Sequence, residues 1–201
     1  MGGRAHRAGE LNMIIYLHGF RSSPESNKAQ RLKAHMEALG FGHLFWCEQL
    51  PVSPRAAIAL AESAIAAATA PVTVVGSSLG GYYATHLAQK HGLRAVLINP
   101  AVVAHLSLAE FVGPQTNMYT GETFDFRPEY IDELRMIEVP QLSRPEDVLL
   151  LVEEGDETLD YRQAVTKYAG CRQRVLPGGD HSFTRFADYM DTILDFAGLL
   201  K

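Results

Sequence analysis

Short, uninterrupted runs of apolar residues recur along the chain. These runs lack the alternation of apolar and polar positions seen in strands with one exposed face, so they are typical of strands covered on both faces of a parallel sheet. They predict β-strands at residues 13–17, 72–75, 94–98 and 148–152, and the less apolar segments 43–47 and 173–176 are predicted as two further strands. Strands that run parallel need crossover connections, which the segments between the runs must supply.

These connecting segments carry apolar residues three or four positions apart, which is the spacing of an amphipathic helix. A first stripe follows Ser23 and Ser26, either of which can cap the helix, and Gly40 closes it. Further helices are predicted at 54–70, at 79–91, at 159–169 and in the C-terminal segment from Phe183 to Phe196. This alternation predicts an α/β fold, with a mainly parallel sheet of about six strands between two layers of helices.

Residues 101–147 interrupt the alternation with an unusually long connection. Two short helices are predicted within it, at 107–112 and 129–137. The segment concentrates aromatic residues, namely Phe111, Tyr119, Phe124, Phe126 and Tyr130. An insertion at this point of a parallel sheet would cover the carboxyl ends of the strands, so we expect a cap that forms an apolar pocket. The alternative is that its aromatic residues only pack the cap against the core.

Candidate chemistry lies where the strand at 72–75 ends. The chain there reads Gly76-x-Ser78-x-Gly80 and continues into a helix, which is the context of a nucleophile elbow. A serine on this tight turn projects its hydroxyl above the sheet, and the flanking glycines let strand and helix approach closely. The backbone N–H of Leu79 then lies at a helix N-terminus, where it can stabilise an oxyanion.

Other glycine-rich loops fit this segment less well. A Walker loop needs Lys followed by Ser or Thr after its second glycine, where Tyr82 and Tyr83 stand, and a dinucleotide loop needs glycine in place of Ser78. An ordinary Gly/Ser-rich turn stays open as an alternative. We therefore predict that Ser78 is a nucleophile.

A second oxyanion donor is expected in the loop after the strand at 13–17. That strand runs directly into His18-Gly19-Phe20, and hydrolases built on this pattern take a backbone N–H from this loop. We assign the donor to Phe20, and we expect His18 to make a structural hydrogen bond. A plain turn at Gly19 is the alternative.

The remaining members of a catalytic triad are expected after the later strands. Asp156 follows Gly155 at the turn after the strand at 148–152, and His181 lies on a loop after the last strand, so the chain order is Ser, Asp, His. His181 would take the proton of Ser78, and Asp156 would hold the His181 tautomer. The weighed alternatives for the acid are Asp160 first and then Glu153, Glu154 and Asp180.

Composition narrows the classes of function. The chain has 201 residues, a formal net charge of −5 and no long basic run, so nucleic acid is not expected as a partner. Two cysteines cannot make a disulfide framework, and His43 with Cys47 lacks further ligands, so no metal or cofactor is expected. Residues 1–10 lack the apolar core of a signal peptide, and no apolar run is long enough to span a membrane. We therefore expect a disordered extension at 1–10, one domain at 11–201 and a cytoplasmic protein.

Several motifs together resemble the YqiA/YcfP-type bacterial esterases, a family of small α/β-hydrolases. They occur in order between Met13 and Leu199 as 16–20, 75–85, 99–102, 119–121, 155–156, 159–165 and 178–183. The resemblance implies an α/β-hydrolase fold and carboxylesterase activity, with the family's catalytic residues falling on Ser78, Asp156 and His181. Arg21 and Asp180 depart from the asparagines expected at their positions, and neither is a triad position.

The sequence thus predicts a serine carboxylesterase that acts on short- to medium-chain acyl esters through an acyl-enzyme intermediate. Gly19, Tyr119, Phe124 and Phe126 are the candidate substrate-binding residues. An acyl thioesterase with the same triad is the nearest alternative, and a non-catalytic small-ligand-binding protein of the same fold is another. The sequence does not predict an oligomeric state.

Overall fold

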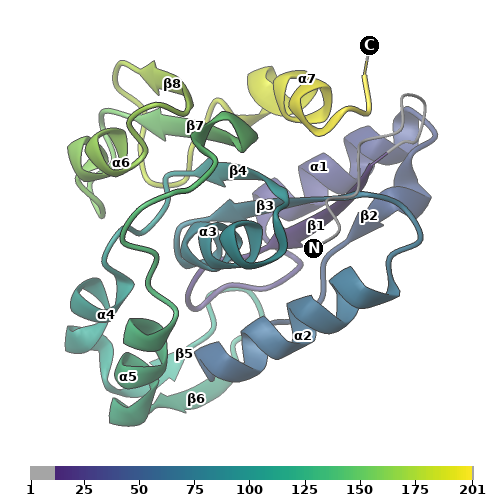
Figure 1. Ribbon diagram of the computed structural model, residues 1–201. Helices are drawn as coiled ribbons and strands as arrows, with labels where there is room; N and C mark the ends of the chain where they lie inside the picture. Colours follow the sequence, from purple (N-terminus) through teal and green to yellow (C-terminus); the bar gives the residue numbers. More distant parts are fainter. Residues whose placement is uncertain (1–11, 201) are drawn as a thin grey trace.

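A parallel sheet of six strands forms the centre of the molecule (Figure 1). The computed structural model describes residues 12–200, so the extension predicted at 1–10 lies outside the described residues. The strand order is β2-β1-β3-β4-β7-β8, and every neighbouring pair is parallel. The strands are β1 (Met13–Leu17), β2 (Phe45–Trp46), β3 (Val72–Ser77), β4 (Arg94–Ile98), β7 (Val148–Glu153) and β8 (Arg172–Leu176).

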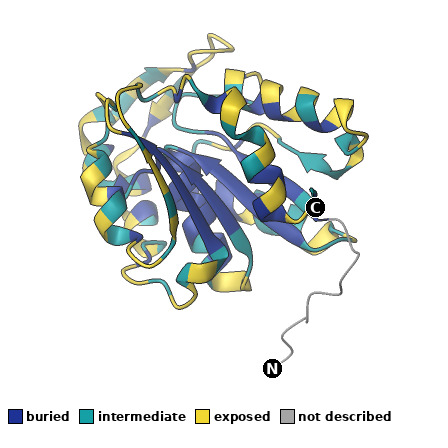
Figure 2. Cartoon of the chain, turned by 90° about the horizontal axis from the view of Figure 1, so that it is seen from above, coloured by how far each residue is buried: buried dark blue, intermediate teal, exposed yellow. Residues whose placement is uncertain are grey.

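Helices cover both faces of this sheet, which confirms the predicted three-layer α/β/α arrangement. Helices α1 (Asn27–Ala38) and α7 (Phe186–Ala197) pack with Ile14 and Tyr16 of β1 on one face. The other face carries α2 (Pro54–Ala67), α3 (Leu79–His91) and α6 (Tyr161–Lys167). Successive strand residues point to opposite faces, and since both faces are covered, every residue of β3 and β7 is buried (Figure 2).

Most predicted elements of this sheet region are confirmed, and the differences are local. The strand predicted at 43–47 is only two residues long because a 3₁₀ turn, Gly42–Leu44, occupies its first half. Helix α6 begins later than predicted, with Asp160 as its N-cap. The prediction that a serine side chain caps α1 is wrong. Ser26 occupies the N-cap position without a side-chain hydrogen bond, and the Ser23 hydroxyl accepts the N–H of Glu25 instead.

The insertion differs more from its prediction. Helix α5 (Pro128–Met136) matches the helix expected at 129–137. The helix expected at 107–112 is replaced by two short segments, α4 (Ala104–Ser107) and the 3₁₀ turn Ala109–Phe111.

Between these helices lies an antiparallel hairpin that the sequence analysis missed, made of β5 (Gly113–Thr116) and β6 (Thr123–Phe126). The Asn117 side chain accepts the N–H groups of Tyr119 and Thr120, and Gly121 adopts a φ of 74°, so this turn joins the two strands. In Figure 1 the hairpin lies below the sheet, beside α2 and α5.

Among the described residues 12–200, no helix combines the length and the apolar character needed to cross a membrane.

Candidate active site

Ser78 occupies a strained turn between β3 and α3. Its φ of 55° and ψ of −121° define a backbone conformation that residues other than glycine rarely adopt. A Cβ atom on Gly76 would lie 2.1 Å from the Gly80 carbonyl oxygen, and one on Gly80 would lie 1.9 Å from the Leu17 carbonyl oxygen. Both positions therefore require glycine, as the elbow pattern predicts, and the close packing holds Ser78 at the carboxyl end of the sheet.

A continuous chain of hydrogen bonds joins Ser78, His181 and Asp156. The His181 Nε2 atom lies 3.1 Å from the Ser78 hydroxyl oxygen. On the other side of the ring, Nδ1 lies 2.8 Å and 3.0 Å from the two carboxylate oxygens of Asp156. Only 2% of the Asp156 side chain is exposed, against 24% for His181. The structure therefore brings together all three residues that the sequence analysis proposed.

The other carboxylates that were weighed as the acid lie elsewhere. Asp160 caps α6 and pairs with Arg162 at the surface, and Glu154 is exposed. Asp180 presents its backbone N–H to Glu153 rather than its carboxylate to His181. Among residues 12–200, Asp156 is the carboxylate within hydrogen-bonding distance of the His181 ring.

Asp156 is itself held by its own turn. One of its carboxylate oxygens accepts the backbone N–H groups of Thr158 and Leu159, at 2.9 and 2.8 Å. These bonds fix the carboxylate in a buried position facing the ring, which is the geometry that keeps a proton on Nδ1 and leaves Nε2 free to accept one.

A buried carboxylate, Glu153, positions the loop that carries His181. Its side chain is fully buried and accepts hydrogen bonds from Arg185 at 2.8 Å and from the backbone N–H of Asp180 at 2.8 Å. Arg185 also donates to the Pro177 carbonyl oxygen, so the Arg185 side chain joins the two ends of the loop that carries His181. A buried charge without partners would be costly, so this ion pair constrains the loop around it.

The same loop is joined to its neighbours through backbone atoms. The Asn99 side chain, at the end of β4, donates to the carbonyl oxygens of Asp180 and His181. A Cβ on Gly155 would lie 2.3 Å from the Gly179 carbonyl oxygen, so the turn of the acid and the loop of the base touch directly.

The sequence analysis assigned no positioning role to Glu153 or Asn99. A signal was present at Glu153, because a carboxylate that directly continues a buried apolar strand must find a partner. Its partner Arg185 lies 32 positions away, which no local pattern shows.

The two predicted oxyanion donors lie beside Ser78. A Cβ on Gly19 would lie 3.7 Å from the Ser78 hydroxyl oxygen, so the segment that carries Phe20 passes directly over the serine. Within residues 12–200, the backbone N–H groups of Phe20 and Leu79 donate to no other protein group. Both donors are therefore available to an oxyanion.

His18 fixes the segment that carries Phe20, which confirms its expected structural role. Its Nε2 atom accepts the backbone N–H of Leu50 at 3.0 Å, so Nδ1 carries the proton and donates to the Gly19 carbonyl oxygen. Burial lowers the pKa of His18, which keeps the ring neutral. Protonation of the ring would put a second N–H at Nε2, facing the backbone N–H of Leu50, and would break this hydrogen bond.

Three hydrogen bonds tie this oxyanion segment to the hairpin of the insertion. Arg21, at a φ of 55°, accepts the Met118 N–H through its carbonyl oxygen and donates through Nε to Thr116. The Asn117 side chain donates to the Ser22 carbonyl oxygen at 2.8 Å. The insertion is thus connected to the site through the backbone as well as through side-chain packing.

A cavity of about 670 Å³ opens onto Ser78 and His181. Its apolar wall comes partly from the sheet loops and partly from the insertion. That wall consists of Ala101, Leu108, Phe111, Met118, Leu159 and Phe183. Gly19 and Tyr119, two of the predicted substrate-binding residues, also line this cavity, and Tyr119 is 49% exposed.

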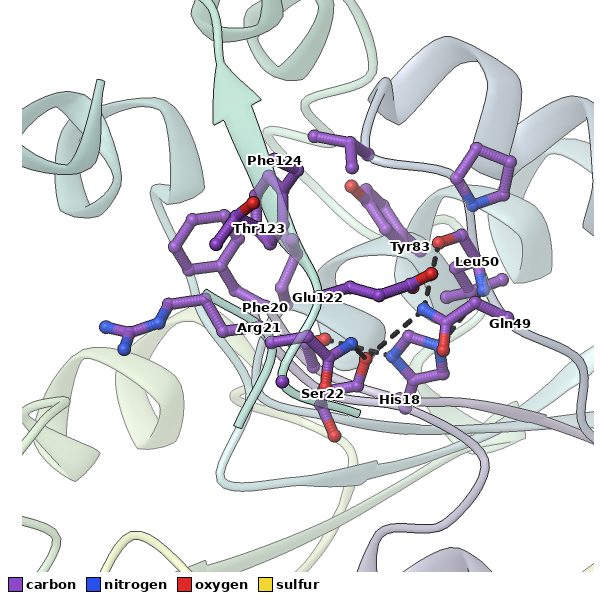
Figure 3. Close-up of a pocket in the computed structure, with 16 residues that line it drawn as sticks. His18, Phe20, Arg21, Ser22, Gln49, Leu50, Tyr83, Glu122, Thr123 and Phe124 are labelled. Atoms are coloured by element: carbon purple, nitrogen blue, oxygen red, sulfur yellow. Dashed lines mark hydrogen bonds between the residues drawn. The ribbon is translucent and has the colours of Figure 1, made fainter. Parts of the chain in front are cut away.

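A second cavity, of about 690 Å³, shares Phe20 and the neighbouring residues of its loop with the first (Figure 3). It is lined by His18, Gln49, Leu50, Tyr83 and Phe124 among others, and it does not include Ser78. The predicted substrate-binding residue Phe124 therefore faces this cavity. Phe126 lines neither cavity: it is 1% exposed and packs against Phe20 at a ring distance of 5.0 Å.

Within residues 12–200, no group of three or more His, Cys, Asp or Glu side chains is arranged to hold a metal ion.

Comparisons with known proteins bear on the family and the fold of this chain. A family model described as "Uncharacterised protein family (UPF0227)" matches residues 13–198. Among solved structures, a protein of Agrobacterium vitis S4 that is provisionally described as a hydrolase has a TM-score of 0.74 at 19% identity, covering 93% of this chain and 88% of that one. The monoacylglycerol lipase of Paleococcus ferrophilus has a TM-score of 0.68 at 14% identity, with 94% and 96% covered.

Alpha/beta hydrolase domain-containing protein 10 from mouse gives a TM-score of 0.65 at 19% identity, covering 90% of this chain and 89% of that one. These likenesses establish the α/β-hydrolase fold predicted from the sequence.

Proposed function

The chain belongs to Uncharacterised protein family UPF0227, and from this premise we propose that it is a serine carboxylesterase. This membership also confirms the family resemblance indicated by the sequence motifs. The observation that carries the proposal is the hydrogen-bonded chain from Asp156 through His181 to Ser78, at the end of a strained elbow. An ordinary turn does not place a serine hydroxyl in line with an imidazole ring and a buried carboxylate.

In the first half of the proposed reaction, the Ser78 oxygen attacks the acyl carbonyl carbon while its proton moves to His181 Nε2, 3.1 Å away. The carbonyl oxygen becomes an oxyanion and accepts hydrogen bonds from the backbone N–H groups of Phe20 and Leu79. Each such donor contributes about 10²- to 10³-fold to turnover in comparable sites. Collapse of this intermediate breaks the ester bond, and His181 gives its proton to the departing alcohol.

In the second half, water replaces the alcohol. His181 takes a proton from the water, whose oxygen attacks the acyl-enzyme carbonyl carbon, and the same two N–H groups stabilise the second oxyanion. The acid product leaves, and Ser78 recovers its proton. Asp156 stays ionised throughout and stabilises the imidazolium that forms twice in the cycle.

The apolar wall of the cavity at Ser78 supports short- or medium-chain acyl groups as the substrate. Leu108, Phe111 and Met118 come from the insertion, and Leu159 comes from the turn before α6. An apolar pocket of this kind contributes about 0.8 kcal/mol per buried methylene group.

Labelling with a fluorophosphonate probe tests the proposal, because such probes form an adduct only with an activated serine. We expect one adduct, mapped to the peptide that contains Ser78. The variant Ser78→Ala is expected to lose labelling and about 10⁴- to 10⁶-fold in kcat, with its fold intact. Ser77→Ala, at the neighbouring buried position, serves as the control and should cost little.

The absence of labelling in folded wild-type protein, together with no hydrolysis of p-nitrophenyl esters, would identify a non-catalytic binding protein of the same fold. Equal losses in Ser77→Ala and Ser78→Ala would show that the elbow has been misread.

A further inference from the structure

The charge of the cavity at Ser78 is opposite to the charge of the whole protein. The chain carries a formal net charge of −5. The cavity is lined by three basic side chains, Arg21, Lys28 and Arg31, and by one carboxylate, Glu110. A cationic cavity in an acidic protein attracts anions more strongly than the net charge suggests, because nearby charges dominate the local potential.

Two of these cations lie at the N-terminal end of α1. This helix has twelve residues, and the first N–H groups of an α-helix lack partners within it. The residue at its N-cap, Ser26, lines the same cavity, and its side chain does not cap the helix. These N–H groups give the end of the helix a partial positive charge that favours an anion.

The Ser26 hydroxyl is an unsatisfied group in the wall of this cavity. Ser26 is 6% exposed, and its Oγ atom is buried without a hydrogen-bond partner among the described residues. A buried hydroxyl without a partner is destabilising, because it has lost its hydrogen bonds to water. No described protein group therefore competes with a ligand for this hydroxyl.

Lys28 and Arg31 have no counter-ion among the described residues. Neither side chain lies within 4.0 Å of a carboxylate in residues 12–200. The Lys28 ammonium donates to the Ser182 carbonyl oxygen at 2.8 Å. Burial lowers its pKa, and the more distant charges of Asp180 and Asp156 oppose that shift. An ammonium group has two further donors to offer a ligand.

The position of Lys28 indicates which part of a substrate would reach it. Ser182, which Lys28 contacts, follows His181 directly in the chain. His181 gives its proton to the leaving alcohol, so the leaving group must lie beside this loop. The apolar residues of the insertion, Leu108 and Phe111, remain for the acyl part.

We propose that the N-terminus of α1, with Ser26, Lys28 and Arg31, binds a phosphate or carboxylate group on the leaving-group part of the ester. This subsite rests on the proposed esterase function and specifies its substrate class: acyl esters of anionic alcohols.

Matched acetyl esters test the subsite. The anionic substrates 4-acetoxyphenyl phosphate and 4-acetoxybenzoate carry the charge on the leaving group and separate phosphate from carboxylate as its source. Methyl 4-acetoxybenzoate is the uncharged match, and the mono-4-nitrophenyl ester of succinate carries its charge on the acyl part. We expect the ratio of kcat/KM for an anionic substrate to that for the uncharged match to fall about tenfold in Lys28→Gln and in Arg31→Gln.

Lys33→Gln is the matched control, because Lys33 is an exposed lysine of the same helix that does not line the cavity. It should keep the wild-type ratio for every substrate. The succinate monoester should show no such fall in any variant. The subsite would be overturned if, for both leaving-group anions, the ratio of kcat/KM had the same value in wild type, Lys28→Gln and Arg31→Gln.

A binding measurement separates failure of the subsite from failure of the esterase. Calorimetry of phenyl phosphate against Ser78→Ala protein needs no turnover, and adding Lys28→Gln and Arg31→Gln to that protein should weaken binding more than tenfold. If this binding depends on the two cations while wild-type protein hydrolyses no ester, the subsite is supported and the esterase is overturned. Binding that is absent, or unchanged by the two substitutions, would overturn the subsite.

Discussion

The loops at the carboxyl ends of the sheet and the insertion at 101–147 build one site by different means. In the sheet loops, backbone meets backbone so closely that Gly76 and Gly155 have no room for a Cβ. In the insertion, apolar side chains reach the surface. Five of the seven exposed large apolar residues of the described chain lie there, namely Leu106, Val112, Met118, Tyr119 and Met136.

This difference separates the reaction from its selectivity. Atoms that must keep fixed distances, such as Ser78 Oγ and His181 Nε2, lie on segments whose neighbours leave no alternative packing. The wall that would contact the acyl chain lies on a segment with several exposed apolar side chains, and exposed side chains can change at a lower cost in stability than buried ones. Substitutions in the two regions should therefore have different effects.

The largest effect is expected at Asp156. The variant Asp156→Asn should lose about 10³- to 10⁴-fold in kcat, because the amide would hold His181 in the wrong tautomer. Steady-state kinetics with p-nitrophenyl acetate measures this loss. Asp160→Asn, at the exposed cap of α6, is the control and should stay within about tenfold of wild type. A larger loss at Asp160 than at Asp156 would contradict the assigned acid.

A loss of stability as well as of turnover is expected at Glu153. Replacing this buried carboxylate by Gln leaves Arg185 without its charge partner, which should lower the free energy of unfolding by about 1–3 kcal/mol, since Arg185 is itself partly exposed. Because the ion pair holds the His181 loop, kcat should fall as well. Thermal unfolding and kinetics measure the two effects. Exposed Glu154→Gln should show neither, and unchanged kcat in Glu153→Gln would remove the positioning role.

Substitutions in the insertion should change selectivity more than rate. Phe111→Ala enlarges the cavity at Ser78, so the preferred acyl chain in a p-nitrophenyl ester series should become longer, with a change of about fourfold in kcat/KM per carbon. Phe126→Ala empties a buried site and should instead lower the free energy of unfolding by about 3–5 kcal/mol.

The variant Phe124→Ala tests which of the two cavities binds the acyl chain. Phe124 lines the second cavity and not the cavity at Ser78, so its removal should leave the chain-length preference unchanged. If Phe111→Ala keeps the wild-type profile and Phe124→Ala shifts it, the acyl chain binds in that second cavity instead.

The smallest effect concerns pH. Burial lowers the pKa of His18 in the folded protein, whereas the unfolded chain binds the proton near the ordinary value of about 6.5. The stability from neutral His18 is therefore complete above that value and is lost as the pH falls towards the lowered pKa of the folded state. His18→Gln should make the decline of the unfolding free energy below pH 6.5 shallower.

The decline should not vanish in that variant, because burial also lowers the pKa of His86. The exposed His43→Gln is the control and should keep the wild-type slope. Urea unfolding between pH 5 and 8 measures all three, and an unchanged slope in His18→Gln would contradict a buried neutral ring.

The sequence was sufficient to predict the strands, the elbow and the residues that the structure brings together at Ser78. Those predictions rest on local rules, namely apolar runs, helix periods and the glycines at 76 and 80. The hairpin at 113–126 was missed because its strands are four residues long and its turn depends on the Asn117 side chain. The ion pair of Glu153 with Arg185 was missed because it joins distant segments.

The three hydrogen bonds between the oxyanion segment and the hairpin have a consequence for protein engineering. Thr116, Asn117 and Met118 all bond to Arg21 or Ser22, next to the proposed donor Phe20. If the insertion is replaced by that of a relative in order to change the substrate specificity, the hydrogen bonds that hold the Phe20 segment are replaced as well. Residues 19–22 and 116–118 should therefore be exchanged together, so that the hydrogen bonds between them are kept.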